Sequence, residues 1–253
     1  MNNCFKNLNR LEFVVTYECT GKCKHCSEGD HPYTGVHLEK NIAEVLSKIK
    51  AKYNITSIMT FGGEPLLYPD TVCAIHTVAT ELKIEKRQLI TNGFFSKDTN
   101  VIKSVARKLS KCGVNDILLS VDAFHQETIP LELVKKFALE IKGNGLNIRT
   151  NPAWIVSRED NNPYNIITQN IIEEFKKYGI KEGTGNIVFP GGNARIYLKE
   201  YFDENKEYIN PYEENPEDLQ SVSIEPDGTA FGESIYEMDI IDIPESYKKQ
   251  KKM

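Results

Sequence analysis

Three of the six cysteines in this 253-residue chain lie within one short segment, at Cys19, Cys23 and Cys26. Their spacing is C-x3-C-x2-C. Thiolates are the usual protein ligands of iron–sulfur clusters. Three of them on one loop reach three corners of a four-iron cube and leave one iron open to a substrate or cofactor. A tight cysteine cluster in a long chain also favours metal binding over a disulfide framework.

Other interpretations of this segment stay open. The cysteines stand at i, i+4 and i+7, as on a buried helix face, but Gly21 and the polar residues between them disfavour a packed helix. A zinc site would need a fourth ligand, for which His25 and His31 are candidates, although zinc sites usually separate their ligand pairs by a longer spacer. A reactive thiol pair is the remaining alternative.

The elements that would position the cysteines alternate between strands and helices. Short apolar, β-branched runs predict strands at 11–17, 55–61, 87–91, 117–121, 146–150 and 186–189. Apolar residues with helical spacing predict helices around 42–49, 72–82, 101–109, 134–141 and 167–178. This alternation predicts parallel βα units with the helices outside. The cysteines then follow the first strand.

A second motif, Gly62-Gly63-Glu64-Pro65, directly follows the second predicted strand. Alone it is compatible with an ordinary turn before a helix. After strand two, with the cysteine loop after strand one, it resembles the radical S-adenosylmethionine (SAM) superfamily over residues 11 to about 195. His25 stands where that family often has an aromatic residue, and its planar ring is a substitute. The resemblance implies an α/β fold, a partial (β/α)6 TIM-like barrel with a short C-terminal hairpin extension.

The resemblance also implies two cofactors. In the family, the open iron of a [4Fe–4S] cluster is chelated by the amino and carboxylate groups of SAM, and the reduced cluster passes one electron to the sulfonium. A 5′-deoxyadenosyl radical then abstracts a hydrogen atom from a substrate, while the protein positions and shields the reactants. One cluster, held by Cys19, Cys23 and Cys26, and SAM are therefore expected here.

Further cofactor-binding candidates stand at the ends of the predicted strands, because the carboxyl ends of parallel strands converge on one face. Gly62, Gly63, Glu64 and Pro65 match the motif that holds the methionine amino group. Ser120 and Asp122 resemble the polar groups that meet the ribose or methionine in related enzymes. Arg149 and Asn151 on strand five point to the same face by alternation, and Asn92 at the end of strand three is a further candidate. Arg149 is a candidate for pairing with the SAM carboxylate. A structural alternative stays open for each; an Asp at a strand end often only caps the next helix.

Two further segments follow later strands. His125, after strand four, is a candidate substrate contact or proton donor, with an ordinary surface histidine as the alternative. Residues 191–195 (Gly-Gly-Asn-Ala-Arg) resemble the adenine-side loop of the family, with less specificity.

The βα rhythm stops after the sixth predicted strand. We expect a core at 1–195 and a C-terminal extension at 196–253, with a hairpin around Pro226-Asp227-Gly228. The hairpin resembles the start of the extension in peptide-modifying and sulfatase-maturing members, which carries cysteines for auxiliary clusters. Here Gly232 stands near the place of such a cysteine, and no cysteine follows Cys112. A truncated extension and a single cluster are expected.

The charge and the apolar pattern of the sequence indicate which classes of binding partner to expect. The formal net charge is -5, and the sequence lacks the basic stripe of a nucleic-acid-binding protein, so a nucleic-acid partner is not expected. No apolar run approaches the roughly 20 residues that span a bilayer, and the first residues lack the apolar core of a signal peptide. We expect a cytoplasmic protein without a membrane partner, reduced by an electron donor such as flavodoxin or ferredoxin.

The expected function is hydrogen abstraction from a peptide or small protein. The outcome expected is one that needs no second cluster, such as epimerisation, rearrangement, or abstraction resolved by a nearby hydrogen donor. A glycyl-radical-enzyme activase is the second expectation, although activases usually carry an Asp and a Lys where this chain has residues 120–124, Ser-Val-Asp-Ala-Phe. A small-metabolite substrate is also open. The non-enzyme alternative is an iron–sulfur electron carrier or interaction protein, which would not need residues 62–65.

Overall fold

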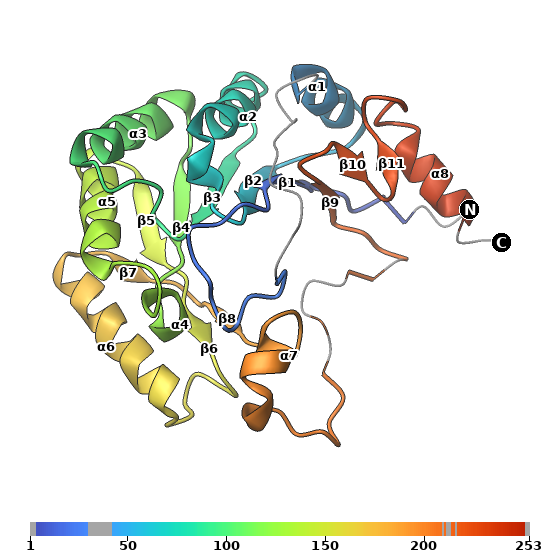
Figure 1. The fold of residues 1–253 in the computed structure, drawn as a ribbon. Helices are drawn as coiled ribbons and strands as arrows, with labels where there is room; N and C mark the ends of the chain where they lie inside the picture. The colour runs from blue at the N-terminus through green and yellow to red at the C-terminus, as the bar shows by residue number, and fades with distance from the viewer. Residues whose placement is uncertain (1–3, 30–41, 209, 211–213, 216, 251–253) are drawn as a thin grey trace.

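The computed structural model describes residues 4–29, 42–208, 210, 214–215 and 217–250. A partial barrel of seven strands forms its centre (Figure 1). The strand order is β7-β5-β4-β3-β2-β1-β9, and every neighbouring pair is parallel. The strands are β1 (Arg10–Thr16), β2 (Ser57–Gly62), β3 (Lys86–Thr91), β4 (Asp116–Leu119), β5 (Asn147–Thr150), β7 (Lys181–Glu182) and β9 (Ser221–Ile224).

The longer helices of the core lie outside this sheet, as Figure 1 shows. They are α1 (Ile42–Lys52), α2 (Pro69–Glu81), α3 (Thr99–Cys112), α5 (Leu131–Gly143) and α6 (Pro163–Lys177). Shorter turns are η1 (Pro65–Leu67), α4 (Ala123–Gln126), α7 (Ala194–Tyr197) and η2 (Lys199–Tyr201), and α8 (Ile243–Gln250) lies near the C-terminus. The predicted α/β class and barrel are confirmed.

Helix α3 illustrates how the sequence sets these boundaries. The Asp98 side chain accepts a hydrogen bond from the Asn100 N–H at 2.7 Å and so caps the first turn. Gly113 ends the helix in the left-handed conformation, with φ of 90°. Between them, Ile102 and Leu109 are buried in the cluster that α3 shares with α2, α5 and the sheet. Apolar periodicity and end signals together therefore fix this element.

The sixth predicted strand, 186–189, is broken in the structure. β7 is the strand that pairs with β5, whereas β8 (Asn186–Ile187) pairs with β6 (Ala153–Trp154) in a separate two-stranded sheet. Gly183 and Gly185 interrupt the ladder. A Cβ on either would lie well under 3.0 Å from a backbone oxygen of the β5–β6 segment. The chain therefore packs too closely there for a regular strand.

The C-terminal extension joins the core sheet. β9 pairs in parallel with β1, with Arg10 opposite Ser221. The predicted turn at 226–228 is present, and the Gly228 N–H donates to the Glu225 carbonyl at 2.9 Å. The antiparallel hairpin itself consists of β10 (Thr229–Ala230) and β11 (Glu233–Ser234).

One apolar cluster connects the extension to the core. It combines residues of β1 and α1 with residues of the extension, including Ile235, Ile240 and Ile243. Residues on both sides of the expected boundary at 195/196 thus share one buried core. No helix in the described part of the chain has the length and apolar character that a bilayer span requires.

Candidate functional site

The cysteine loop leaves β1 at the carboxyl-terminal edge of the sheet. Cys19 is exposed, Cys23 is buried, and Cys26 is half-buried. The Cys26 N–H donates to the Cys23 carbonyl at 3.2 Å, which closes a tight turn. Although Cys19 is exposed, the surrounding loop atoms desolvate its thiol and raise its pKa to about 11, with a smaller contribution from Glu64 and Cys26. The thiols are thus close enough to influence one another.

Gly62 and Gly63 hold the start of this loop. The Gly63 N–H donates to the Thr16 carbonyl at 2.7 Å, and the Glu64 N–H donates to the Glu18 carbonyl at 2.8 Å. A Cβ on Gly62 would lie well under 3.0 Å from the Thr16 oxygen, and one on Gly63 would lie as close to the Glu18 oxygen. Both glycines are therefore needed for backbone contact with the end of β1.

Glu64 lies inside the protein, with none of its surface exposed. Its carboxylate accepts hydrogen bonds from the Leu66 N–H at 2.9 Å, the Thr91 hydroxyl at 2.7 Å and the Asn92 N–H at 2.8 Å. Burial raises the pKa of this carboxyl to about 7, against the opposing effect of these donors. Glu64 therefore ties the turn after β2 to the end of β3.

Asn92 connects the end of β3 to the cysteine loop. Its Nδ2 lies 3.6 Å from the Cys19 sulfur and donates to the Thr20 hydroxyl at 3.2 Å. Sequence reasoning selected Asn92 but not Thr91, whose hydroxyl completes the Glu64 site. A threonine within a strand is common, so nothing in the sequence distinguishes it.

Asp122 is fully buried and both caps α4 and orients His125. Its carboxylate accepts from the His125 N–H at 2.9 Å and the Ala153 N–H at 3.0 Å, and Oδ2 lies 2.8 Å from His125 Nδ1. Burial alone would raise the pKa of Asp122, but the charge and hydrogen bonds of His125 outweigh it and hold that pKa well below its usual range. The capping alternative is therefore realised, and His125 is a fixed side chain.

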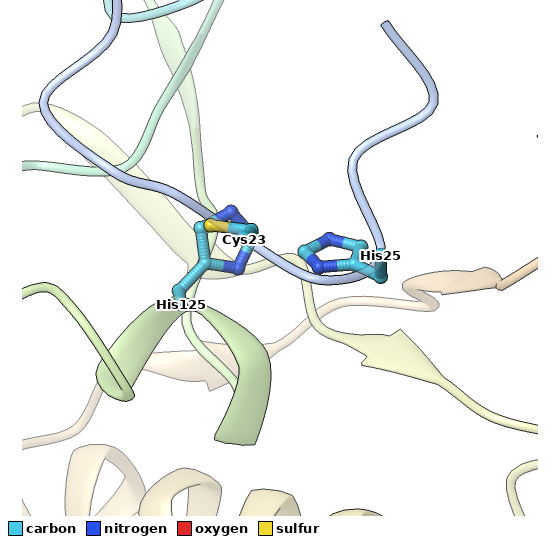
Figure 2. Close-up of side chains that lie close together, drawn as sticks. All are labelled: Cys23, His25 and His125. Carbon is cyan, nitrogen blue, oxygen red and sulfur yellow. The ribbon is translucent and has the colours of Figure 1, made fainter. Parts of the chain in front are cut away.

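His25 and His125 lie beside Cys23, as Figure 2 shows. One potential ligand atom from each of the three residues lies within 4.8 Å of the others. The His25 ring packs against Phe124 and His125, with centroid separations of 4.9 and 4.8 Å. Burial lowers the pKa of His25 to about 4, so its ring is neutral at pH 7. His25 thus packs as an aromatic ring. Of the two histidines considered as a fourth zinc ligand beside the loop cysteines, His25 lies next to Cys23, and His31 lies outside the described residues.

Other predicted residues lie farther along the strands. Arg149 forms an ion pair with Asp116, the first residue of β4, so its guanidinium is engaged toward the amino-terminal end of the sheet. Ser120 is half-buried directly after β4, where its N–H donates to the Thr91 carbonyl at 2.8 Å. Asn151 lines a cavity inside the barrel. Their contact with SAM remains an expectation.

Residues 191–195 lie against the second half of the cysteine loop. The Asn193 N–H donates to the Cys26 carbonyl at 2.9 Å, and its Nδ2 donates to the Cys23 carbonyl at 3.2 Å. The sequence indicated this segment as an adenine-side loop. In the structure it also contacts the backbone around two of the cysteines.

The donor set of the loop fits an iron–sulfur cluster. It offers three thiols, and amide N–H groups already point at sulfur: the Gly21 N–H donates to Cys19 Sγ at 3.4 Å, beside Asn92. Thiolate ligands with hydrogen bonds to sulfur are the usual setting of such clusters.

Comparison with known proteins agrees with this site. Residues 13–144, just over half of the chain, match the family model described as the Radical SAM superfamily. A curated relative, "Probable GTP 3′,8-cyclase" from Saccharolobus solfataricus, is 26% identical over 210 residues, which cover 80% of this chain and 65% of the relative. The chain thus spans somewhat less than two thirds of that protein.

Solved structures share the fold. SuiB of Streptococcus suis, bound to S-adenosylmethionine, matches 94% of this chain and 65% of its own, with a TM-score of 0.58 and 17% identity. The enzyme anSMEcpe, solved with AdoMet and the Cp18Cys peptide, matches 72% of this chain and 51% of its own, with a TM-score of 0.53 and 17% identity. With the family match, these findings assign the chain to the radical SAM superfamily, the enzymes that use a [4Fe–4S] cluster and SAM.

Proposed function

We propose that this enzyme binds one [4Fe–4S] cluster through Cys19, Cys23 and Cys26, cleaves SAM reductively, and abstracts hydrogen from a peptide or small protein. The observation that carries the proposal is the meeting of the cysteine loop with the Gly62–Glu64 turn and Asn92 at the carboxyl ends of three adjacent strands. When bound, the cluster and SAM together supply a 5′-deoxyadenosyl radical.

The chain's own residues provide positioning. Gly62 and Gly63 fix the start of the cysteine loop, and Asn92 directs an amide at the Cys19 sulfur. His125 is the candidate for proton donation to a substrate. Because Asp122 engages Nδ1, Nε2 is the ring nitrogen left for a ligand. Ser120 and Asn151 remain candidates for contact with SAM, whereas Arg149 would have to leave its ion pair with Asp116 to reach it.

A peptide substrate is supported by the shared fold with anSMEcpe, which was solved with a peptide. It is also supported by the hairpin extension, because the sequence around 226–228 resembles that of peptide-modifying members. Flavodoxin or ferredoxin is the expected electron donor.

A small polar molecule is the second candidate substrate. The relative named as a probable GTP 3′,8-cyclase favours such a substrate. The cavity of about 520 Å³ inside the barrel gives this candidate no support, because its lining includes Arg10, Lys86 and Ser221 at the amino-terminal ends of β1, β3 and β9 and no residue of the cysteine loop.

Anaerobic reconstitution tests the cluster. We expect about four irons per chain and release of 5′-deoxyadenosine when dithionite and SAM are added. Changing all three loop cysteines to serine abolishes both results, whereas Cys4→Ser, outside the loop, preserves them. About eight irons per chain would contradict a single cluster, and zinc without iron would contradict the proposal.

Substrate class is tested by stimulation of that release. Peptides encoded by genes beside this one are compared with nucleotides and sugars at equal concentration. Stimulation by a peptide, with a mass change in it, supports the first candidate. Stimulation by small molecules only would replace it with the second.

A further inference from the structure

The cysteine loop is held at two places by segments far away in the sequence. Its start rests on the turn after β2, through the carbonyls of Thr16 and Glu18. Its second half, from Cys23 to Ser27, rests on the segment that precedes α7. The first contact orients the region of Cys19. The second contact involves the other two cysteines, Cys23 and Cys26, and its central residue is Asn193.

Asn193 joins both ends of the Cys23–Cys26 turn. The Cys23 carbonyl accepts from the Cys26 N–H at 3.2 Å and from Asn193 Nδ2 at 3.2 Å. The Cys26 carbonyl accepts from the Asn193 backbone N–H at 2.9 Å. One residue therefore donates to the carbonyls of two expected cluster ligands, across a sequence separation of 170.

The Asn193 side chain does not cap the helix that follows it. Asn193 precedes α7 at the N-cap position, where an asparagine side chain commonly accepts a backbone hydrogen bond. Here it makes no capping bond, and its φ of −64° and ψ of −32° are helical. Its amide is directed to the cysteine loop.

Gly192 allows the close approach. Its φ is 48°, and a Cβ there would lie well under 3.0 Å from the carbonyl oxygens of Cys26 and Ser27. The backbone before α7 therefore packs directly on the loop, which brings the two donors of Asn193 within reach of their acceptors.

We propose that Asn193 is a positioning residue for the iron–sulfur cluster, and that its two hydrogen bonds hold Cys23 and Cys26 at the separation the cluster requires. The inference rests on the proposed cluster at the three loop cysteines. It adds that the segment between β8 and α7, which precedes the extension, helps to build the cluster site.

The test compares Asn193→Ala with Asn193→Asp in the full chain. Alanine adopts the same backbone angles and keeps the backbone donor, but it removes the side-chain amide with its Nδ2 donor. Aspartate fills the same space but places an oxygen against the Cys23 carbonyl. Ile196→Ala is the matched control, because Ile196 lies in α7, the helix that Asn193 precedes, and is 66% exposed.

The readouts are iron and sulfide per reconstituted chain, the rate of iron loss to a chelator, and the melting temperature of the cluster-free protein. From the usual strength of one hydrogen bond, we expect iron loss to be about 2- to 10-fold faster in Asn193→Ala. Asn193→Asp should lose iron faster still, and Ile196→Ala should match the wild type. Because the same hydrogen bond is present in the cluster-free structure, cluster-free Asn193→Ala should melt about 1–6 °C below the wild type, whereas Ile196→Ala should melt with the wild type.

Each contrary result has a definite meaning. Equal iron loss in the wild type and both Asn193 variants overturns the inference. Normal retention in Asn193→Asp with rapid loss in Asn193→Ala also overturns it, because space filling would then matter and the donor would not. Should the alanine variant fail to fold, the isosteric aspartate variant carries the comparison. A wild-type chain that binds no iron would instead refute the proposed function.

Discussion

Adding a single methyl group at Gly63 should loosen the cysteine loop. Gly63 does not have a positive φ, so alanine adopts its backbone conformation without strain. Its Cβ, however, would lie well under 3.0 Å from the Glu18 carbonyl oxygen, a backbone atom that cannot rotate away. The backbone on one side must therefore move.

The magnitude follows from the contacts that this movement disturbs. Overpacking in a tight site costs about 1–3 kcal/mol. The hydrogen bonds from Gly63 to Thr16 and from Glu64 to Glu18 each contribute about 0.5–1.5 kcal/mol. Together these give a loss of about 2–6 kcal/mol in the free energy of unfolding. For a chain of this size, at about 2 °C per kcal/mol, that corresponds to a fall of about 4–12 °C in melting temperature.

Gly143→Ala is the matched control, because a Cβ there meets nothing within 4 Å and Gly143 is the last residue of α5. It should melt at or slightly above the wild type. Both variants are melted as cluster-free protein by circular dichroism and then reconstituted for iron analysis. The reasoning is refuted if Gly63→Ala melts with Gly143→Ala and retains iron equally well.

Three further predictions concern charged and hydrogen-bonded side chains in the cluster-free protein. Because the folded-state pKa of Asp122 is depressed, Asp122→Asn should have a lower free energy of unfolding than the wild type at pH 7. In urea unfolding, this difference in free energy should become smaller as the pH falls below about 3.8. The folded-state pKa of Glu64 is raised to about 7, so wild-type stability relative to Glu64→Gln should fall as the pH rises from 4.5 to 7, by about 3 kcal/mol at most. Tyr17→Phe removes a hydrogen bond to Glu225 and should lower the free energy of unfolding by about 1.5–3 kcal/mol in urea.

These three predictions fail in distinguishable ways. A pH-independent gap for Asp122→Asn would show that its carboxylate is not held ionised by His125. If the free energy of unfolding of Glu64→Gln differs from that of the wild type by a constant amount from pH 4.5 to 7, burial does not raise the pKa of Glu64. Unchanged unfolding of Tyr17→Phe would show that the contact between the loop and the segment after β9 contributes nothing to stability.

The sequence by itself determined the cysteine spacing, the βα rhythm and the order of motifs along the chain. Cys19, Cys23 and Cys26 lie on one loop whatever the rest of the chain does, because their separation is local. The first five strands follow from residues whose neighbours in sequence decide their burial, so their periodicity was visible without the structure.

The tertiary structure decided which distant atoms meet. The sequence suggested that Gly62 and Gly63 approach a ligand; the structure shows that they approach the end of β1. It also gave Arg149 an ion pair with Asp116 and placed β9 beside β1. None of these pairings has a period or spacing in the sequence, because each depends on how separate segments dock.

Asn193 shows both what the sequence predicts and what only the tertiary structure decides. Its place in a Gly-Gly-Asn segment was visible as a loop signal. Its hydrogen bonds to Cys23 and Cys26 arise only when the segment before α7 packs against the cysteine loop, 170 residues earlier. Residue types and spacing thus predict the cluster ligands, while packing between distant segments determines which atoms contact the loop that carries them.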